Sequence, residues 1–200
     1  IIPMQSYNTT VQDEIYASDD SSNWAVSPLY SYRVIDNVKP QIVTSRNPVQ
    51  PRANQNDTVQ ADVIEPADAS GAKTATCHYR VNNGQWVNTT MTFNETSKLW
   101  EMTIPSQQAH DVVEYYVEAW DNAGNTNQTV TYNYTVALQG DANLDHKVDI
   151  LDVAGISAHW YVLTGPYGPL GYDAQYDLNG DGRINILDMA IVNSDWHKTW

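Results

Sequence analysis

The chain is poor in basic residues and cysteine, and it has no long apolar run. Ten Lys and Arg stand against 24 Asp and Glu, which gives a formal net charge of −14. Nucleic acids and anionic membranes bind clusters of Lys and Arg, so this deficit argues against both as partners. No apolar run approaches the roughly 20 residues that a membrane-spanning helix needs, which argues against membrane insertion. Cys77 is the single cysteine and cannot form an internal disulfide.

The start of the chain carries neither Met nor a signal-like segment, so we expect it to be the C-terminal part of a longer protein. Six Asn-x-Thr triplets fit a glycosylated surface protein and favour a secreted or cell-surface location. These triplets begin at Asn8, Asn56, Asn88, Asn94, Asn127 and Asn133.

Aromatic and β-branched residues dominate the first two thirds of the chain. The 13 Tyr and 7 Trp, together with many Thr and Val, favour strands over long helices. The turn at Asn82-Asn83-Gly84 supplies positive-φ residues for a tight hairpin. Alternating segments predict strands at 41–45, 57–65, 73–81, 85–93, 98–104, 112–120 and 127–136. This pattern predicts a two-sheet β-sandwich over residues 38–138.

An internal repeat precedes this sandwich. With an offset of 102 residues and no gap, Ile2-Pro3 aligns with Ile104-Pro105, and the alternating apolar pattern then agrees in both copies. Identical residues recur in the aligned segments, for example Tyr32 with Tyr134 and Val34 with Val136. We therefore interpret residues 1–37 as the final strands of a preceding, truncated domain of the same kind.

The segment VEYYVEAWDNAGN, residues 113–125, resembles the penultimate strand and turn of immunoglobulin-like or fibronectin type III-like modules of microbial secreted proteins. That resemblance implies a spacer or scaffolding role. Trp86, Trp100 and Trp120 could instead form a sugar-stacking platform. At strand spacing such residues are more often core or edge aromatics, so carbohydrate binding ranks as a lesser alternative.

No catalytic constellation is evident in the sequence. The polar candidates of the sandwich have no spacing that implies a metal site or a nucleophile–base pair; they are His78, His110, Glu114 and Glu118. We expect this chain to have no catalytic activity of its own.

Two twelve-residue segments, 141–152 and 177–188, carry oxygen-bearing side chains at positions 1, 3, 5, 9 and 12. Calcium takes six to eight oxygen ligands, which this spacing supplies with one backbone carbonyl at position 7. The duplication predicts two Ca²⁺ ions. We expect folding of the module to be coupled to calcium binding. The predicted ligands are Asp141, Asn143, Asp145, Lys147 (carbonyl), Asp149, Asp152, Asp177, Asn179, Asp181, Arg183 (carbonyl), Asn185 and Asp188.

Position 6 of these loops, where the chain turns sharply, is Gly182 in the second loop and His146 in the first. His accepts a positive φ less readily than Gly does. We expect the first loop to bind calcium more weakly.

Each loop leads into an apolar helix, predicted at 150–162 and 186–198. One stripe of each helix should form the core of the module: Val153, Ile156 and Trp160, and Met189, Val192 and Trp196, together with Val148 and Ile184. The opposite stripe should be exposed and bind a partner: Leu151, Ala154, Gly155 and Ala158, and Leu187, Ala190, Ile191 and Ser194. The alternative is that this stripe packs against the other helix or the 163–175 connector.

The segments GDANLDHKVDILDVAGI and DLNGDGRINILDMAIV resemble the duplicated loop–helix units of type I dockerins, and the resemblance covers residues 139–200. It implies a small all-α, EF-hand-like calcium module that binds a cohesin domain. The contact residues that it implies are Ile150, Leu151, Ser157 and Ala158, and Ile186, Leu187, Asn193 and Ser194. Near-symmetry of the halves implies that either helix could dominate the contact.

The sequence thus predicts a multi-domain chain: truncated strands, an all-β sandwich, and a calcium-dependent docking module that attaches a larger secreted protein to a scaffold or cell surface. Two alternatives stay open. Calcium could stabilise a structural or adhesive tail without a cohesin partner, or the sandwich could bind carbohydrate.

Overall fold

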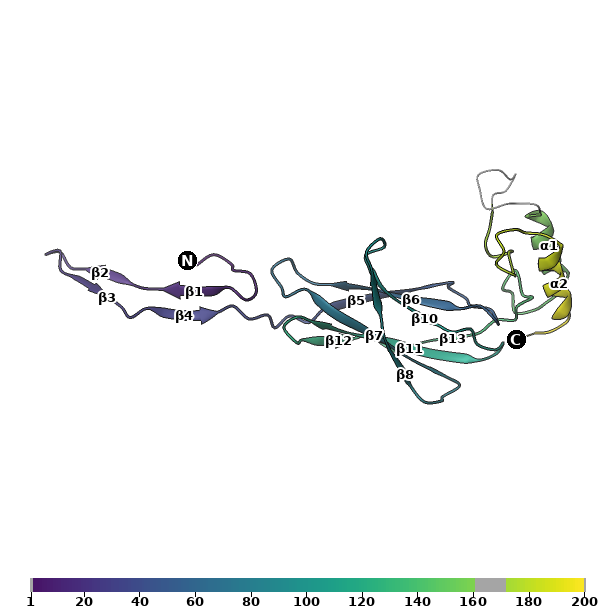
Figure 1. Cartoon of the computed structure of the whole chain (residues 1–200), viewed down its shortest axis with the longest axis horizontal. Helices are drawn as coiled ribbons and strands as arrows, with labels where there is room; N and C mark the ends of the chain where they lie inside the picture. The colour runs from purple at the N-terminus through teal and green to yellow at the C-terminus, as the bar shows by residue number, and fades with distance from the viewer. Residues whose placement is uncertain (1, 161–171, 200) are drawn as a thin grey trace.

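The computed structural model describes residues 2–160 and 172–199. Three parts follow one another along the long axis of the molecule: a ribbon of two-stranded pairs, a β-sandwich, and a helical module at the far end (Figure 1). Within these described ranges, no helix combines the length and apolar character required to cross a bilayer.

The ribbon is formed by residues that precede the sandwich. Strand β1 (Thr10–Asp13) pairs with β4 (Tyr30–Arg33), and β2 (Tyr16–Ser18) pairs with β3 (Trp24–Val26), both antiparallel. A two-stranded ribbon has no core of its own. Accordingly its large apolar side chains, such as Ile15 and Tyr32, are exposed.

The sandwich consists of two antiparallel sheets. The first has the order β5 (Gln41–Asn47), β6 (Asp57–Ile64), β10 (Leu99–Ile104), β9 (Thr92–Asn94). The second has the order β12 (Thr126–Gln128), β11 (Val112–Asp121), β7 (Ala72–Val81), β8 (Val87–Thr90), and β13 (Tyr132–Thr135) also pairs with β11. The predicted all-β sandwich is therefore confirmed.

Alternation of apolar and polar residues creates the core between the sheets. Along β11, Val113, Val117 and Ala119 face inward and are fully buried, while Glu114, Tyr116 and Glu118 are partly exposed. They meet Val59 and Ile104 of the other sheet in one cluster. Full burial of such a side chain contributes about 1.5–3 kcal/mol.

The strand predictions agree closely with the structure except at two places. The predicted strand 127–136 is two strands, β12 and β13, which both pair with β11. The predicted strand 85–93 is two strands in different sheets, because the chain crosses from β8 to β9 at Met91. Met91 N donates to Ala75 O (2.9 Å), and its side chain is buried in the core, which fixes the crossing point. Asn82 and Asn83 have φ values of 50° and 58°, as the hairpin prediction requires.

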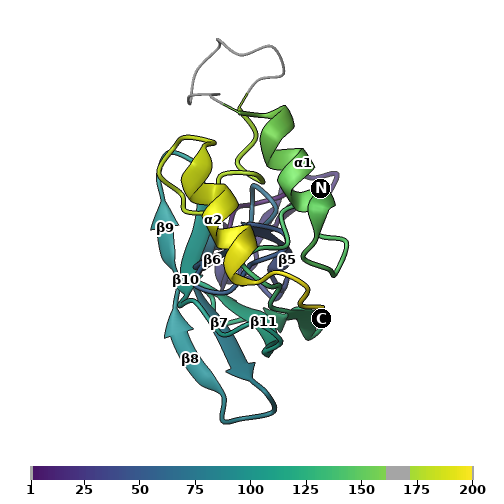
Figure 2. The same cartoon turned by 90° about the vertical axis from the view of Figure 1, so that its right-hand side faces the viewer.

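The helical module contains α1 (Ile150–Ala158) and α2 (Ile186–Ser194), which lie next to each other at the end of the sandwich (Figure 2). Its core combines both helices with residues outside them: Leu138, Ala142, Val148, Ile156, Ile184 and Val192, with Val153, Trp160, Tyr176 and Met189 at its edge.

Two details of the helical prediction are wrong. Helix α2 ends at Ser194 and not at residue 198, because the following segment pairs with the first loop: Val148 N donates to Lys198 O and His197 N to Val148 O, both at 2.9 Å. This departure leaves Trp196 exposed and not in the core. Helix α1 ends at Ala158, and residues 161 and 162 of its predicted range lie outside the described residues.

A buried ion pair stabilises the edge of the sandwich core. Arg46 contacts the almost fully buried Asp57 (3.2 Å) and stacks on the Tyr134 ring, with 3.9 Å from the guanidinium carbon to the ring centroid. Burial raises the pKa of the Asp57 carboxyl, although Arg46 acts in the opposite direction. Asp57 therefore depends on Arg46 as its counter-charge.

We expect Arg46→Met to lower the unfolding free energy of the sandwich by about 3 kcal/mol, because it leaves a buried carboxylate unpaired. Since a raised folded-state pKa makes the folded state take up the proton first, the loss should shrink as the pH falls toward 4. Urea unfolding at several pH values measures both effects. Lys98→Met, at the exposed pair with Glu95, should change stability by less than about 1 kcal/mol.

Candidate calcium loops and binding surfaces

The two acidic loops have the same hydrogen-bond network. In the first, Asp141 Oδ1 and Asn143 Oδ1 accept from Asp145 N at 3.1 and 3.0 Å. In the second, Asp177 Oδ1 and Asn179 Oδ1 accept from Asp181 N at 3.2 and 3.0 Å. Asn143 Nδ2 also donates to Asp145 Oδ2, and Asn179 Nδ2 to Asp181 Oδ2, both at 3.1 Å. The structure thus brings the side chains at positions 1, 3 and 5 close together in both loops.

Positions 9 and 12 connect each loop to the helix that follows. The position-9 side chains are N-caps: Asp149 accepts from Leu151 N and Asn185 from Leu187 N, both at 2.8 Å. The position-12 carboxylate of Asp152 accepts from Asn143 N (3.0 Å) and Asp149 N (2.8 Å). Asp188 binds the matching amides, with Asn185 N at 2.8 Å and Asn179 N at 3.3 Å. One carboxylate therefore joins the start of the loop to the start of the helix, a capping box that the sequence analysis missed.

The donor set fits a hard divalent cation. Asp141, Asp152 and Asp188 are fully buried, and Asp177 is nearly so. In the part of the chain that the structure describes, no Lys or Arg forms an ion pair with Asp152 or Asp188. Burial raises the pKa of the Asp152 carboxyl. Lys147 and Arg183 have exposed side chains; their predicted role at position 7 is through the carbonyl oxygen.

Backbone strain distinguishes the two loops. Positions 4 and 6 are left-handed in both, with φ values of 60° and 75° at Leu144 and His146, and 70° and 81° at Gly180 and Gly182. Glycine adopts this conformation freely, whereas other residues pay about 1–2 kcal/mol. The left-handed residue at position 6 is predicted from the sequence, whereas Leu144 at position 4 is not.

The contact residues that the dockerin resemblance implies are all exposed on the helices, but two residues of the predicted exposed stripes are not. The first two residues of each helix have matching exposures: 62% and 55% for Ile150 and Leu151, and 62% and 55% for Ile186 and Leu187. The others are also exposed: Ala154, Ser157, Ala158, Ala190, Asn193 and Ser194. Gly155 and Ile191, from the same predicted stripes, are only half-buried; Gly155 lies against the Tyr176 ring.

A second candidate surface lies on the outer face of the five-stranded sheet. His78 and Tyr116 stack with ring centroids 4.4 Å apart, and Trp86 meets Tyr116 edge-on at 5.2 Å. Arg80 lies over Trp86 and is held by the carboxylate of Glu114 at 2.7 Å. Trp86 thus belongs to an ordered, accessible aromatic group, which we call the aromatic face: His78, Arg80, Trp86 and Tyr116.

The other two tryptophans considered for sugar binding lie elsewhere. Trp100 packs against the core and Phe93, with ring centroids 5.4 Å apart. Trp120 lines a groove with Thr74, Thr76 and Thr90 at another part of the outer face. The structure therefore does not bring the three tryptophans together.

We expect Leu144→Gly combined with His146→Gly to tighten calcium binding at the first loop by about tenfold, because both substitutions relieve left-handed strain. Calorimetric titration would measure the two affinities. Ala substitution of Gly180 and Gly182 should weaken the second loop correspondingly. Equal affinities before and after the glycine substitutions would contradict the strain argument.

Two family models match separate parts of the chain. Residues 139–195 match the Dockerin type I domain, and residues 52–129 match Carbohydrate binding module family 56. Both describe non-catalytic modules. No curated protein matches the chain.

Several solved structures resemble the sandwich. A Br derivative of BhCBM56 is 21% identical with a TM-score of 0.38, and the match covers 50% of this chain and 96% of that one. A family 56 β-1,3-glucan binding domain is 24% identical with a TM-score of 0.35, covering 47% and 98%. A family 64 laminaripentaose-producing β-1,3-glucanase from Paenibacillus barengoltzii, complexed with laminarihexaose, is 22% identical with a TM-score of 0.36, covering 47% and 20%.

These matches correct two predictions about the sandwich. The finer assignment to immunoglobulin-like or fibronectin type III-like modules is replaced by the family 56 match. Carbohydrate binding, which is only a lesser alternative on the sequence alone, is the function that the family 56 match favours for this domain. The predicted dockerin is confirmed: this chain ends in a type I dockerin domain, which follows a β-sandwich that matches a carbohydrate-binding family.

Proposed function

We propose that this part of the protein attaches a larger secreted protein to a cohesin domain in a calcium-dependent way, while its sandwich binds a β-1,3-glucan. The observation that carries the docking function is the duplicated apolar pair at the start of each helix. Ile150 with Leu151 and Ile186 with Leu187 are exposed to the same extent and occupy positions 10 and 11 of the acidic loops, where each helix begins. Exposed apolar groups of this kind are typical of partner surfaces.

Calcium dependence follows from the way the loops and helices are connected. We infer that two Ca²⁺ ions bind, one to each loop, through the predicted side chains and the position-7 carbonyls. A bound ion would neutralise the converging carboxylates and fix the position-12 residue. Asp152 and Asp188 also accept hydrogen bonds from the backbone amides of the N-cap residues, Asp149 and Asn185. Each ion would therefore order the start of the helix and the apolar pair there. Without the ions, like-charge repulsion opposes this arrangement.

The near-symmetry of the module supports two binding orientations. The two loops form equivalent internal hydrogen bonds, both helices span nine residues, and the apolar pairs have equal exposure. A cohesin that recognises one helix start could therefore recognise the other after a rotation of the module. We infer that the contact residues are those on both exposed stripes.

Binding of β-1,3-glucan by the sandwich is supported by the aromatic face. Trp86 is 38% exposed; Arg80 covers one face of its ring and Tyr116 meets it edge-on, so a sugar ring would stack on the face opposite Arg80. Polar side chains at its border, Asn88 and Glu118, can bind hydroxyl groups. We take the sugar class from the family 56 domain described as β-1,3-glucan binding.

We infer that residues 2–37 are the last strands of a second copy of the sandwich. The proposed domains are then residues 1–37, 38–138 and 139–200. Their pairing supports this, since each pair in the ribbon has a counterpart 102 residues later: Thr10 with Arg33 corresponds to Val112 with Thr135, and Tyr16 with Val26 to Glu118 with Gln128. Ile15 is 66% exposed, whereas its counterpart Val117 is fully buried.

We expect Leu151→Asp combined with Leu187→Asp to reduce capture by immobilised type I cohesins by about 100-fold or more, because a charge replaces an apolar anchor on both helices. Calcium affinity and helical circular dichroism should stay unchanged. Val130→Asp, at an exposed apolar residue of the sandwich, is the matched control. Unchanged capture by a cohesin that binds the wild type would favour a structural tail over a docking module.

We expect Trp86→Ala to weaken binding of laminarin, a soluble β-1,3-glucan, by about tenfold, the loss of roughly 1.4 kcal/mol of stacking. Affinity electrophoresis would measure it. Trp24→Ala, an exposed tryptophan of the ribbon, should have no effect. If both variants bind laminarin as the wild type does, the aromatic face is not the sugar site.

A further inference from the structure

The dockerin does not hang from the sandwich on a free linker. Residues 50–55, which connect β5 to β6, lie along residues 135–142 at the junction. Ala53 N donates to Ala137 O and Ala137 N to Pro51 O, both at 2.9 Å, and Gln50 and Asn54 add side-chain bonds to Thr135 and Gln139. The junction is therefore a built interface.

Arg52 extends from this interface into the first calcium loop. Its Nε donates to Asp141 O (2.9 Å) and its Nη2 to Ala142 O (3.0 Å), so one guanidinium holds positions 1 and 2 of the loop. The residue is only 6% exposed. A planar guanidinium presents its donors in a fixed fork, which makes this contact geometrically specific.

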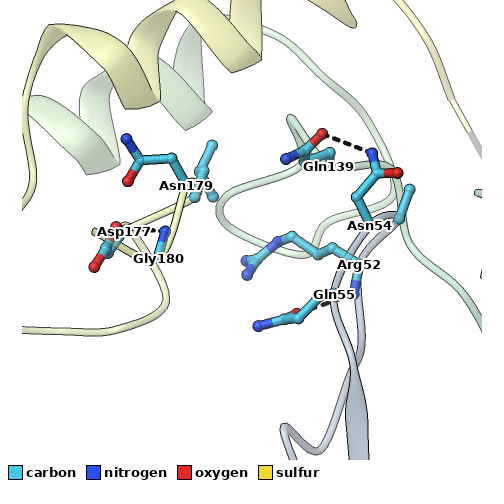
Figure 3. A pocket seen from close by; sticks show the side chains of 9 residues that line it. Arg52, Asn54, Gln55, Gln139, Asp177, Asn179 and Gly180 are labelled. Carbon is cyan, nitrogen blue, oxygen red and sulfur yellow. Dashed lines mark hydrogen bonds between the residues drawn. The ribbon is translucent and has the colours of Figure 1, made fainter. Parts of the chain in front are cut away.

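The carbonyl of Ala142 also joins the second half of the module. It accepts from Gln175 Nε2 (2.9 Å), just before the second loop, as well as from Arg52. The second loop itself faces Asn54 and Gln55 across a cavity of about 130 Å³ (Figure 3). Among the described residues, no hydrogen bond links the sandwich to residues 177–188, so the sandwich holds only the first loop directly.

We infer that Arg52 of the sandwich is a positioning residue of the first calcium loop, so that calcium binding there and rigid attachment of the dockerin to the sandwich strengthen each other. Arg52 fixes the backbone of Asp141, whose carboxylate begins the ligand set. By thermodynamic linkage, if an ordered junction strengthens calcium binding, then bound calcium stabilises the ordered junction by the same free energy. This inference rests on the proposed binding of calcium to the first loop.

The charge of Arg52 attracts the carboxylates of Asp141 and Asp152, but it opposes calcium binding, because a guanidinium near a divalent cation repels the cation. Arg52→Lys separates the two effects: the variant keeps the positive charge but loses the fork that reaches two carbonyls. Arg33→Lys, at an exposed arginine of β4, is the matched control.

The experiment is a calcium titration of the full chain followed by ¹⁵N NMR, with the amides of His146 and Gly182 reporting the first and second loops separately. For Arg52→Lys we expect the dissociation constant of the first loop to rise by about tenfold, the usual size of such outer contacts, with little change at the second. Relaxation measurements should show the sandwich and dockerin tumbling as one body in calcium-loaded wild type, and separately in Arg52→Lys or without calcium.

The outcomes distinguish the inference from the function on which it rests. No calcium binding to wild type at either loop would sink the proposed function. Normal calcium binding with equal first-loop affinity in wild type and Arg52→Lys would overturn the inference alone, as would joint tumbling of the two domains in that variant. Should Arg52→Lys lose the sandwich fold, Asn54→Ala together with Gln50→Ala would test the same junction through its side-chain bonds, with separate tumbling expected and joint tumbling contradicting the inference.

Discussion

The C-terminal module depends on bringing several carboxylates of like charge into one small loop, twice. Asp152 and Asp188 are fully buried, and among the described residues neither forms an ion pair with Lys or Arg. Burying a charge is costly enough that such groups normally pair or bind a metal. The helix starts are tied to the same carboxylates through the capping boxes. The exposed apolar pairs are therefore positioned by the electrostatics of the loops and not by helix propensity, which is weak for helices of nine residues.

Features encoded by local spacing could be predicted from the sequence, and features that join distant segments could not. Ligand positions, strand alternation and the exposed helical stripes follow from periods of two or three to four residues. Arg52 lies 89 residues before Asp141, and no local pattern identifies a residue that contacts a loop so far away. The prediction that Trp196 lies in the core is wrong for a related reason, since the helix before it is ended by pairing between Val148 and Lys198, 50 residues apart.

For the sandwich, the fold is predicted correctly from the sequence, but the family is not. Its two sheets, β5-β6-β10-β9 and β12-β11-β7-β8, have the strand order of immunoglobulin-like sandwiches with one added edge strand. The VEYYVEAWDNAGN segment therefore reports a central strand and its turn, which sandwiches of different families share. The aromatic face was harder to foresee, because His78, Trp86 and Tyr116 come from two strands and the β7–β8 turn, and meet only when β7 pairs with β11.

A fixed junction changes what two binding surfaces on one chain can achieve. The aromatic face lies on a sheet of the sandwich, and the docking helices lie at the end of the molecule (Figures 1 and 2). With a flexible linker, engaging both ligands would cost the orientational freedom of the dockerin at the second binding step. The bonds from Arg52 to the first loop remove much of that freedom in advance. In the part of the chain that the structure describes, no hydrogen bond joins the sandwich to the second loop. A partner bound to α1 would therefore contact a more rigidly held helix than a partner bound to α2, although the two helices present nearly the same surface.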